Sequence, residues 1–123
     1  MIAARHSAPR TAGNGIVVAL LVGAALALVP RAAAAEDTVT LSVTLKDHKF
    51  DPAELHAPAN TPIDIKIKNA GDIVMEFESS DLHFEKIVPV GRDGVVHVRP
   101  QQPGRYNFFD DFHHETQGYL IVP

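Results

Sequence analysis

The strongest constraint on the fold is an alternation of apolar and polar residues with a period of two. It is clearest in residues 39–45, VTLSVTL, and in residues 63–68, IDIKIK. Successive side chains of a strand point to opposite faces of a sheet, so each segment predicts a strand with one buried face. Shorter segments of this kind predict strands at 75–79, 82–88, 95–99, 105–109 and 119–122. No segment after residue 35 has a helical period, and we expect about seven strands.

Turn-forming residues separate these segments, as in Asn69-Ala70-Gly71-Asp72, Asp93-Gly94 and Pro103-Gly104. Short strands spaced by turns predict an antiparallel sandwich or a small barrel, and of these we expect the all-β sandwich. The chain has 123 residues, which suits one compact domain and excludes catalytic folds that need about 250 residues.

Residues 1–35 differ from the rest and are interpreted as a secretory signal peptide. They combine early arginines, an apolar run at 16–29 and an alanine-rich end that suits a signal peptidase. A retained membrane anchor is the alternative, but the run is shorter than the ~20 residues that span a bilayer core. We therefore expect a domain of residues 36–123 that is exported to the periplasm.

Composition excludes several classes of function. All 15 acidic residues follow residue 35, so the exported domain is acidic and poorly suited to nucleic acid. The sequence has no cysteine. Disulfide scaffolds, zinc ribbons, iron–sulfur sites and thiol nucleophiles are therefore excluded.

Acidic and histidine residues gather in two segments. In the first, residues 75–78 (MEFE), a strand would direct both glutamates to one face and the apolar residues to the other. The second, residues 110–115 (DDFHHE), is expected to be a loop between two strands. Asp81, His83 and Glu85 would share one face of a further strand.

Asp110 and His113 form a candidate pair of metal ligands, because carboxylate and imidazole both bind divalent first-row metals. The alternative is a solvated turn with local hydrogen bonds. Nearby aromatic residues favour the metal site, since polar groups desolvated beside them need a partner. His48 follows an early strand and is by itself expected to be an exposed loop histidine, with approach to the same rim as the alternative.

The order of these elements resembles the cupredoxins. The similarity is carried by Met75-Glu-Phe, by Pro103-Gly-Arg-Tyr-Asn-Phe and by GYLIV at residues 118–122. This resemblance implies a cupredoxin-like Greek-key β-sandwich over residues 36–123.

The sequence departs from the blue-copper members of that superfamily at three of four ligands. Those members carry histidine where this chain has Met75, cysteine where it has Asp110, and methionine near the position of Thr116. Only His113 remains. A thiolate copper centre is excluded because the thiolate is missing.

A narrower resemblance is to the small cupredoxin-like component of bacterial ferrous-iron uptake systems. It rests on Phe50-Asp-Pro, MEFES at 75–79, Glu85-Lys and FFDDFH at 108–113. The resemblance implies a set of metal ligands: Glu76, Glu85, Asp110 and His113, with Met75, His48, Glu78 and Asp111 as further candidates. It also implies two partners, a periplasmic metal-binding protein and a membrane iron permease.

Three functions follow as expectations. The first is binding of ferrous iron and help in its oxidation for delivery to the permease, a ferroxidase-type activity shared with a complex. The second is a periplasmic copper carrier that uses His113, Met75 and acidic residues. The third is a metal-free interaction module that kept the sandwich and lost the site. The expected cofactor is iron or copper.

Overall fold

The structure is a computed structural model that describes residues 3, 9, 13–15, 30 and 36–123. The predicted signal peptide therefore lies almost wholly outside the described residues, and the architecture below is that of residues 36–123. In the described part of the chain, no helix has the length and apolar character that crossing a membrane requires.

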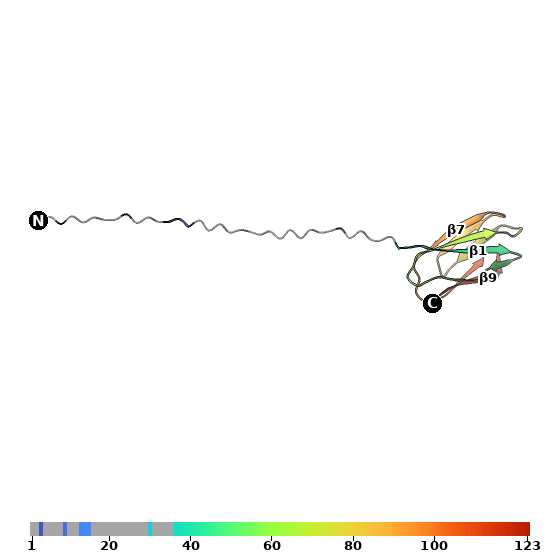
Figure 1. Cartoon of the computed structure of the whole chain (residues 1–123). Helices are drawn as coiled ribbons and strands as arrows, with labels where there is room; N and C mark the ends of the chain where they lie inside the picture. Colours follow the sequence, from blue (N-terminus) through green and yellow to red (C-terminus); the bar gives the residue numbers. More distant parts are fainter. Residues whose placement is uncertain (1–2, 4–8, 10–12, 16–29, 31–35) are drawn as a thin grey trace. The chain divides into compact units, whose positions relative to one another are not determined.

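Residues 36–123 form nine strands in two sheets, and the predicted all-β sandwich is confirmed (Figure 1). One sheet has the order β2-β1-β4-β7 and the other β3-β9-β8-β5-β6. The strands are β1 (Val39–Lys46), β2 (Lys49–Asp51), β3 (Glu54–His56), β4 (Ile63–Asn69), β5 (Met75–Ser79), β6 (Phe84–Val88), β7 (Asp93–Val98), β8 (Gly104–Asp110) and β9 (His113–Val122).

The nine strands differ from the expected seven in three places. The short strands β2 and β3 were not expected, because three residues are too few to display an alternation. The segment 110–115 is not a long loop, since β9 begins at His113 and pairs with β8. Residues 81–83 form a turn, so Asp81 and His83 do not share a strand face with Glu85.

The strand directions bring several connections together at one end of the sandwich. β1 and β4 run parallel, so the β1–β2 turn and the segment after β4 lie at the same end. Bonds from Ala70 N–H to the Leu45 carbonyl and from the Thr116 hydroxyl to the His48 carbonyl join these connections. We call this end, with residues 47–48, 70–74, 89–92 and 111–112, the loop end.

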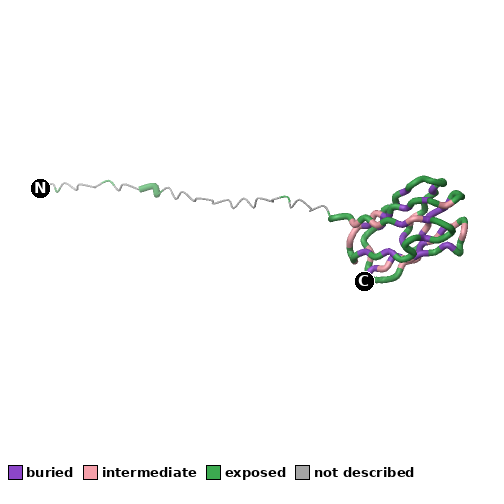
Figure 2. Tube along the Cα trace, turned by 45° about the vertical axis from the view of Figure 1, so that its right-hand side comes forward, coloured by how far each residue is buried: buried purple, intermediate pink, exposed green. Residues whose placement is uncertain are grey.

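The core lies between the two sheets (Figure 2). Alternate residues of β4 fill it, and Ile63, Ile65 and Ile67 are almost fully buried. On the other sheet Phe77 and Phe108 are fully buried, with ring centroids 5.4 Å apart. Burial of this apolar surface is the main stabilising contribution to the sandwich.

Gly118 of β9 lies directly opposite Phe108 of β8, and the Phe108 ring covers it. A Cβ atom at residue 118 would overlap that ring and approach the Ala53 carbonyl oxygen to 2.9 Å. The ring is fully buried and the carbonyl is backbone, so neither can move aside cheaply.

We expect Gly118→Ala to lower the free energy of unfolding by about 2–3 kcal/mol, because overpacking a filled core costs that much. Urea denaturation measures the change. Gly104→Ala is the matched control, since its Cβ would meet only the half-buried Tyr106 ring at 3.3 Å. Equal stability of the two variants would contradict this account of Gly118.

Candidate metal centre

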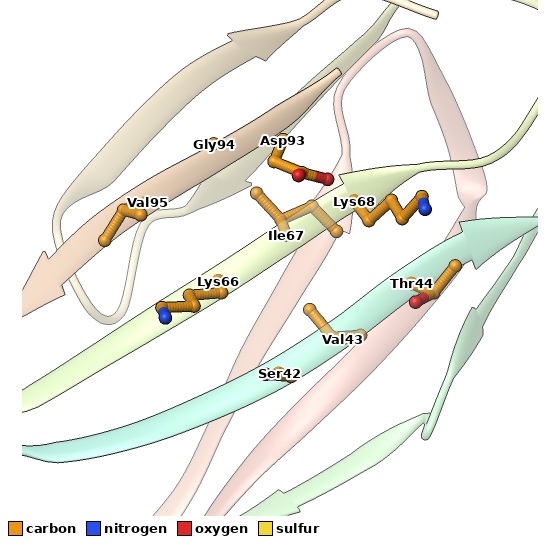
Figure 3. A pocket seen from close by; sticks show the side chains of 9 residues that line it. All are labelled: Ser42, Val43, Thr44, Lys66, Ile67, Lys68, Asp93, Gly94 and Val95. Atoms are coloured by element: carbon orange, nitrogen blue, oxygen red, sulfur yellow. The ribbon is translucent and has the colours of Figure 1, made fainter. Parts of the chain in front are cut away.

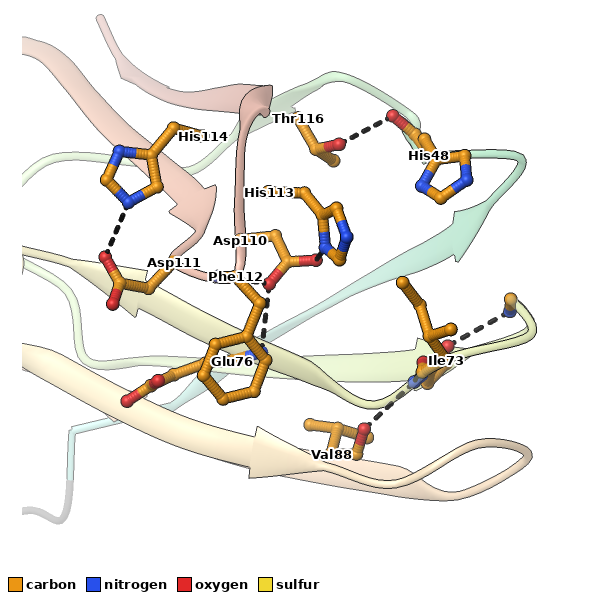
Figure 4. A network of polar contacts seen from close by, with 12 residues as sticks. His48, Ile73, Glu76, Val88, Asp110, Asp111, Phe112, His113, His114 and Thr116 are labelled. Carbon is orange, nitrogen blue, oxygen red and sulfur yellow. Dashed lines mark hydrogen bonds and ion pairs between the residues drawn. The ribbon is translucent and has the colours of Figure 1, made fainter.

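Asp110 is the buried carboxylate around which the loop end is built. It ends β8 on the inner face, two residues after Phe108, and is 2% exposed. Its Oδ1 accepts hydrogen bonds from the backbone N–H of Glu76 (3.0 Å) and of Phe112 (3.1 Å). Its Oδ2 lies 3.3 Å from Nδ1 of His113. Asp110 thus ties β5 to the β8–β9 turn and orients one imidazole (Figure 4).

His113 and His48 lie beside one another at the loop end. Their ring centroids are 5.5 Å apart. Asp47 and His48 both have left-handed backbones, as a two-residue hairpin turn requires, and the Thr116 hydroxyl holds the His48 carbonyl at 2.8 Å. His48 is an exposed turn histidine, as expected, and its ring also lies beside that of His113. Because an ionised Asp110 only accepts, His113 donates from Nδ1, and in the neutral form of its ring the lone pair lies on Nε2, the arrangement found in many metal-binding histidines.

The second group is a set of carboxylates on the outer face of β5 and β6, and we call it the carboxylate cluster. Its members are Glu76, Glu78, Glu85 and Asp111. Glu78 lies directly opposite Glu85 across the two strands, and Glu76 lies on the diagonal. The Asp111 N–H donates to the Glu76 carbonyl at 2.9 Å, which brings Asp111 to the same edge. Like charges this close repel, so the cluster favours a cation.

Glu76 is the most perturbed member of the cluster. The residue is only 9% exposed. Its pKa is raised from 4.5 to about 7, first by a side-chain hydrogen bond with Glu85, then by burial and by the negative charges of Glu85, Asp111 and Glu78. The pKa of Glu78 is also raised, chiefly by burial and then by Asp111 and Glu85, while His114 opposes the shift. Glu76 therefore keeps its proton to a higher pH than an ordinary glutamate does.

The structure divides the predicted ligands between the loop end and the outer face of β5 and β6. Asp110, His113 and His48 lie together at the loop end, whereas Glu76 and Glu85 lie together on the outer face. In Figure 4 the Glu76 side chain leads away from His113. Met75 is fully buried on the inner face. Among the described residues, no three histidine, aspartate or glutamate side chains are arranged to hold a metal ion as they stand.

Two residues that position the site were named in the sequence, one in a turn and one at a missing ligand position, but neither was expected to have this role. Asn69 is fully buried, and its amide donates to the carbonyls of Ile73 (2.8 Å) and Val88 (2.9 Å). Thr116 holds His48. In both cases the period-two alternation could have shown that the residue is buried. Asn69 continues the buried face of β4, and Thr116 continues that of β9. A polar residue on a buried face must have a hydrogen-bond partner.

Two cavities lie near these strands. One, of about 340 Å³, opens at the loop end and is lined by Asp47, His48, Ala70, Gly71 and Asp72. The other, of about 450 Å³, is a groove on the opposite sheet over β1, β4 and β7 (Figure 3). Lys66 and Lys68 project beside it, and no predicted ligand lines it.

The loop end does not fit a thiolate copper centre. Where such a centre needs a sulfur ligand, Asp110 stands with both oxygens already engaged. Its hydrogen bonds resemble those of a residue that supports a ligand more than those of a free ligand.

The chain belongs to the cupredoxin-like domain family, whose description matches residues 17–122. It is 43% identical over 88 residues to the uncharacterized protein RP394 of Rickettsia prowazekii (strain Madrid E), covering 71% of this chain and 70% of that protein.

Solved structures of low identity share the fold. The Cu(I)-bound metal-binding domain of the Cu(I)-exporting P-type ATPase CopA of Streptococcus pneumoniae D39 has a TM-score of 0.61 at 15% identity, over 73% of this chain and 99% of that domain. A chain of a heme-copper terminal oxidase dimer has a TM-score of 0.59 at 20% identity, over 69% of this chain. The present chain spans 65% of the length of that oxidase chain.

We expect Asp110→Ala to lower the free energy of unfolding by about 3 kcal/mol, because it leaves two backbone N–H groups without their acceptor. Asp110→Asn keeps one oxygen that can accept from those N–H groups, so it should lower the free energy of unfolding by about half as much. The neighbouring Asp111→Ala is the control, since the Asp111–His114 pair is exposed and contributes less than about 1 kcal/mol. Urea denaturation measures all three, and similar losses for Asp110→Ala and Asp111→Ala would refute the bracing role.

We also expect part of the stability to be lost as the pH rises from 4.5 to about 7. An acid whose pKa is higher in the folded state binds more protons when folded, so deprotonation weakens the folded state across that interval. Glu76→Gln should remove this component, and Glu85→Gln should reduce it because it removes the main cause of the shift. Thermal midpoints measured between pH 4 and 8 test this, and a Glu76→Gln profile parallel to wild type would disprove it.

Proposed function

We propose that the chain is a metal-binding cupredoxin-like protein that takes up ferrous iron at the carboxylate cluster. The observation that carries this proposal is the gathering of four carboxylates: Glu78 lies opposite Glu85 across β5 and β6, Glu76 lies on the diagonal, and Asp111 reaches the same edge. A divalent cation bound among them would relieve their mutual repulsion. Glu85 is exposed and Glu78 half-exposed, so their side chains are free to turn toward an ion.

The chemistry of this cluster favours oxidation of its cargo. Anionic oxygen ligands stabilise Fe(III) more than Fe(II), which lowers the potential of the couple. Each tenfold preference for Fe(III) lowers it by about 59 mV. The step is Fe²⁺ to Fe³⁺ with loss of one electron, and that electron passes to an acceptor outside this chain. We therefore infer a ferroxidase-type role that the chain performs as part of a complex.

Compartment and partners belong to the same proposal. Its signal-like leader supports export to the periplasm, where the chain would receive iron beside a periplasmic metal-binding protein. The oxidised ion would pass to a membrane iron permease. The resemblance of MEFES and FFDDFH to iron-uptake components supports both partners.

Copper binding at the loop end is the second candidate function. It is favoured by one observation, the 5.5 Å approach of the His48 and His113 rings, with Nε2 of His113 available to a metal. Two imidazoles suit Cu(II), which binds nitrogen sites most tightly of the divalent first-row ions. Cupredoxin-fold domains that bind copper, such as the CopA domain, lend support.

Metal titration of paired variants distinguishes the two functions. Under anaerobic conditions we expect Glu76→Gln/Glu85→Gln to weaken Fe(II) binding by about tenfold or more, because both oxygen ligands lose their charge. His48→Ala/His113→Ala should leave Fe(II) affinity unchanged and weaken Cu(II) binding. Isothermal titration calorimetry measures both.

Glu54→Gln is the control, because Glu54 lies on β3 and pairs only with His56 in the described structure. Fe(II) affinity that depends on the histidines and not on the glutamates would reject the carboxylate cluster. Binding of copper alone would favour the second function, and binding of neither metal would favour a metal-free interaction module.

A further inference from the structure

A cavity of about 240 Å³ lies away from the loop end. It is lined by Leu82, His83, His97, Arg99 and Gln101. His97 pairs in register with Asp64, near the start of β4, whereas the loop end adjoins the final residue of that strand, Asn69. No carboxylate lines this cavity, although the chain is acidic. We call it the distal cavity.

Hydrogen bonds hold the walls of the distal cavity in place. The Ser79 hydroxyl accepts from Leu82 N–H (3.0 Å) and donates to the Asn107 carbonyl (2.6 Å), which fixes the turn that carries His83. Across the cavity, the Gln101 amide donates to the Arg99 carbonyl (2.8 Å). The turn that carries His83 and the Gln101 side chain are thus held in place before any ligand arrives, which lowers part of the entropic cost of binding.

Three side chains present hydrogen-bond donors to the distal cavity. Arg99 contributes a permanently charged guanidinium, and within residues 36–123 it forms no salt bridge. His83 contributes an imidazole N–H, and Gln101 keeps one amide hydrogen after its bond to Arg99. A guanidinium repels cations and binds oxyanions in a forked geometry, so the ligand class is an oxyanion.

His97 adds a hydrogen-bond acceptor. Its Nδ1 lies 2.6 Å from the Asp64 carboxylate, which does not line the cavity. An ionised carboxylate only accepts, so Nδ1 carries a proton, and in the neutral form of the ring the lone pair lies on Nε2. That lone pair accepts a hydrogen bond from a hydroxyl group of the ligand.

We propose that the distal cavity binds an oxyanion that also carries a hydroxyl group, such as hydrogen phosphate or a hydroxycarboxylate. The oxyanion accepts from Arg99, and the hydroxyl donates to Nε2 of His97. This site is independent of the metal proposed for the carboxylate cluster and remains if that proposal fails.

Titration with inorganic phosphate and with sulfate tests the distal cavity. Near pH 7 both forms of phosphate keep a hydroxyl, whereas sulfate has none. We expect phosphate to shift the imidazole NMR signals of His83 and His97 saturably, with about tenfold weaker binding for sulfate. Arg99→Gln should weaken phosphate binding by about tenfold or more.

Two further variants separate binding from structural effects. Asp64→Ala frees the His97 tautomer, so it should abolish the preference for phosphate over sulfate while leaving Arg99 in place. Arg105→Gln is the control, because Arg105 stacks on the Tyr119 ring at 3.8 Å and does not line the cavity. The proposal is overturned if neither anion shifts the signals saturably, or if Arg99→Gln binds phosphate as tightly as wild type does. It is also overturned if Zn²⁺ shifts these signals and the anions do not.

Discussion

The hydrogen bonds of the buried Asp110 carboxylate decide the arrangement of the loop end. One oxygen joins β5 to the β8–β9 turn and the other orients His113. A buried carboxylate is costly unless its lone pairs are matched, and here three donors match it. The position that holds a cysteine in blue-copper proteins has therefore become a structural brace.

The pleat of β5 separates the loop end from the carboxylate cluster. Met75 and Phe77 enter the core, while Glu76 and Glu78 face outward. Glu76 takes part in both regions, because its backbone N–H bonds to Asp110 and its side chain contacts Glu85. A change of charge on that side chain thus occurs beside the backbone that holds Asp110. Glu76 therefore connects the loop end, through its backbone, with the carboxylate cluster, through its side chain.

Much of this structure could be predicted from the sequence. The alternation in β1 and β4 identified the strands and their buried faces, and the spacing of MEFE placed both glutamates on one face. The split of the predicted ligands could not be predicted, because it depends on which strands become neighbours. Asp110 and Glu76 belong to adjacent strands, yet one side chain points inward and the other outward. The turn at 81–83 was also missed, since alternate polar residues occur in turns as well as in strands.

The distribution of charge follows from the same pleat. Three carboxylates on the outward face of β5 and β6, with Asp111 at their edge, are unfavourable by themselves, and the raised pKa of Glu76, caused first by its hydrogen bond with Glu85, reflects their closeness. Such a face is tolerated because the sandwich obtains its stability elsewhere, from the aliphatic and aromatic core. Stability and surface charge are therefore carried by opposite faces of one strand. The carboxylates can vary without loss of the core, because the residues that hold the sandwich together face the other way.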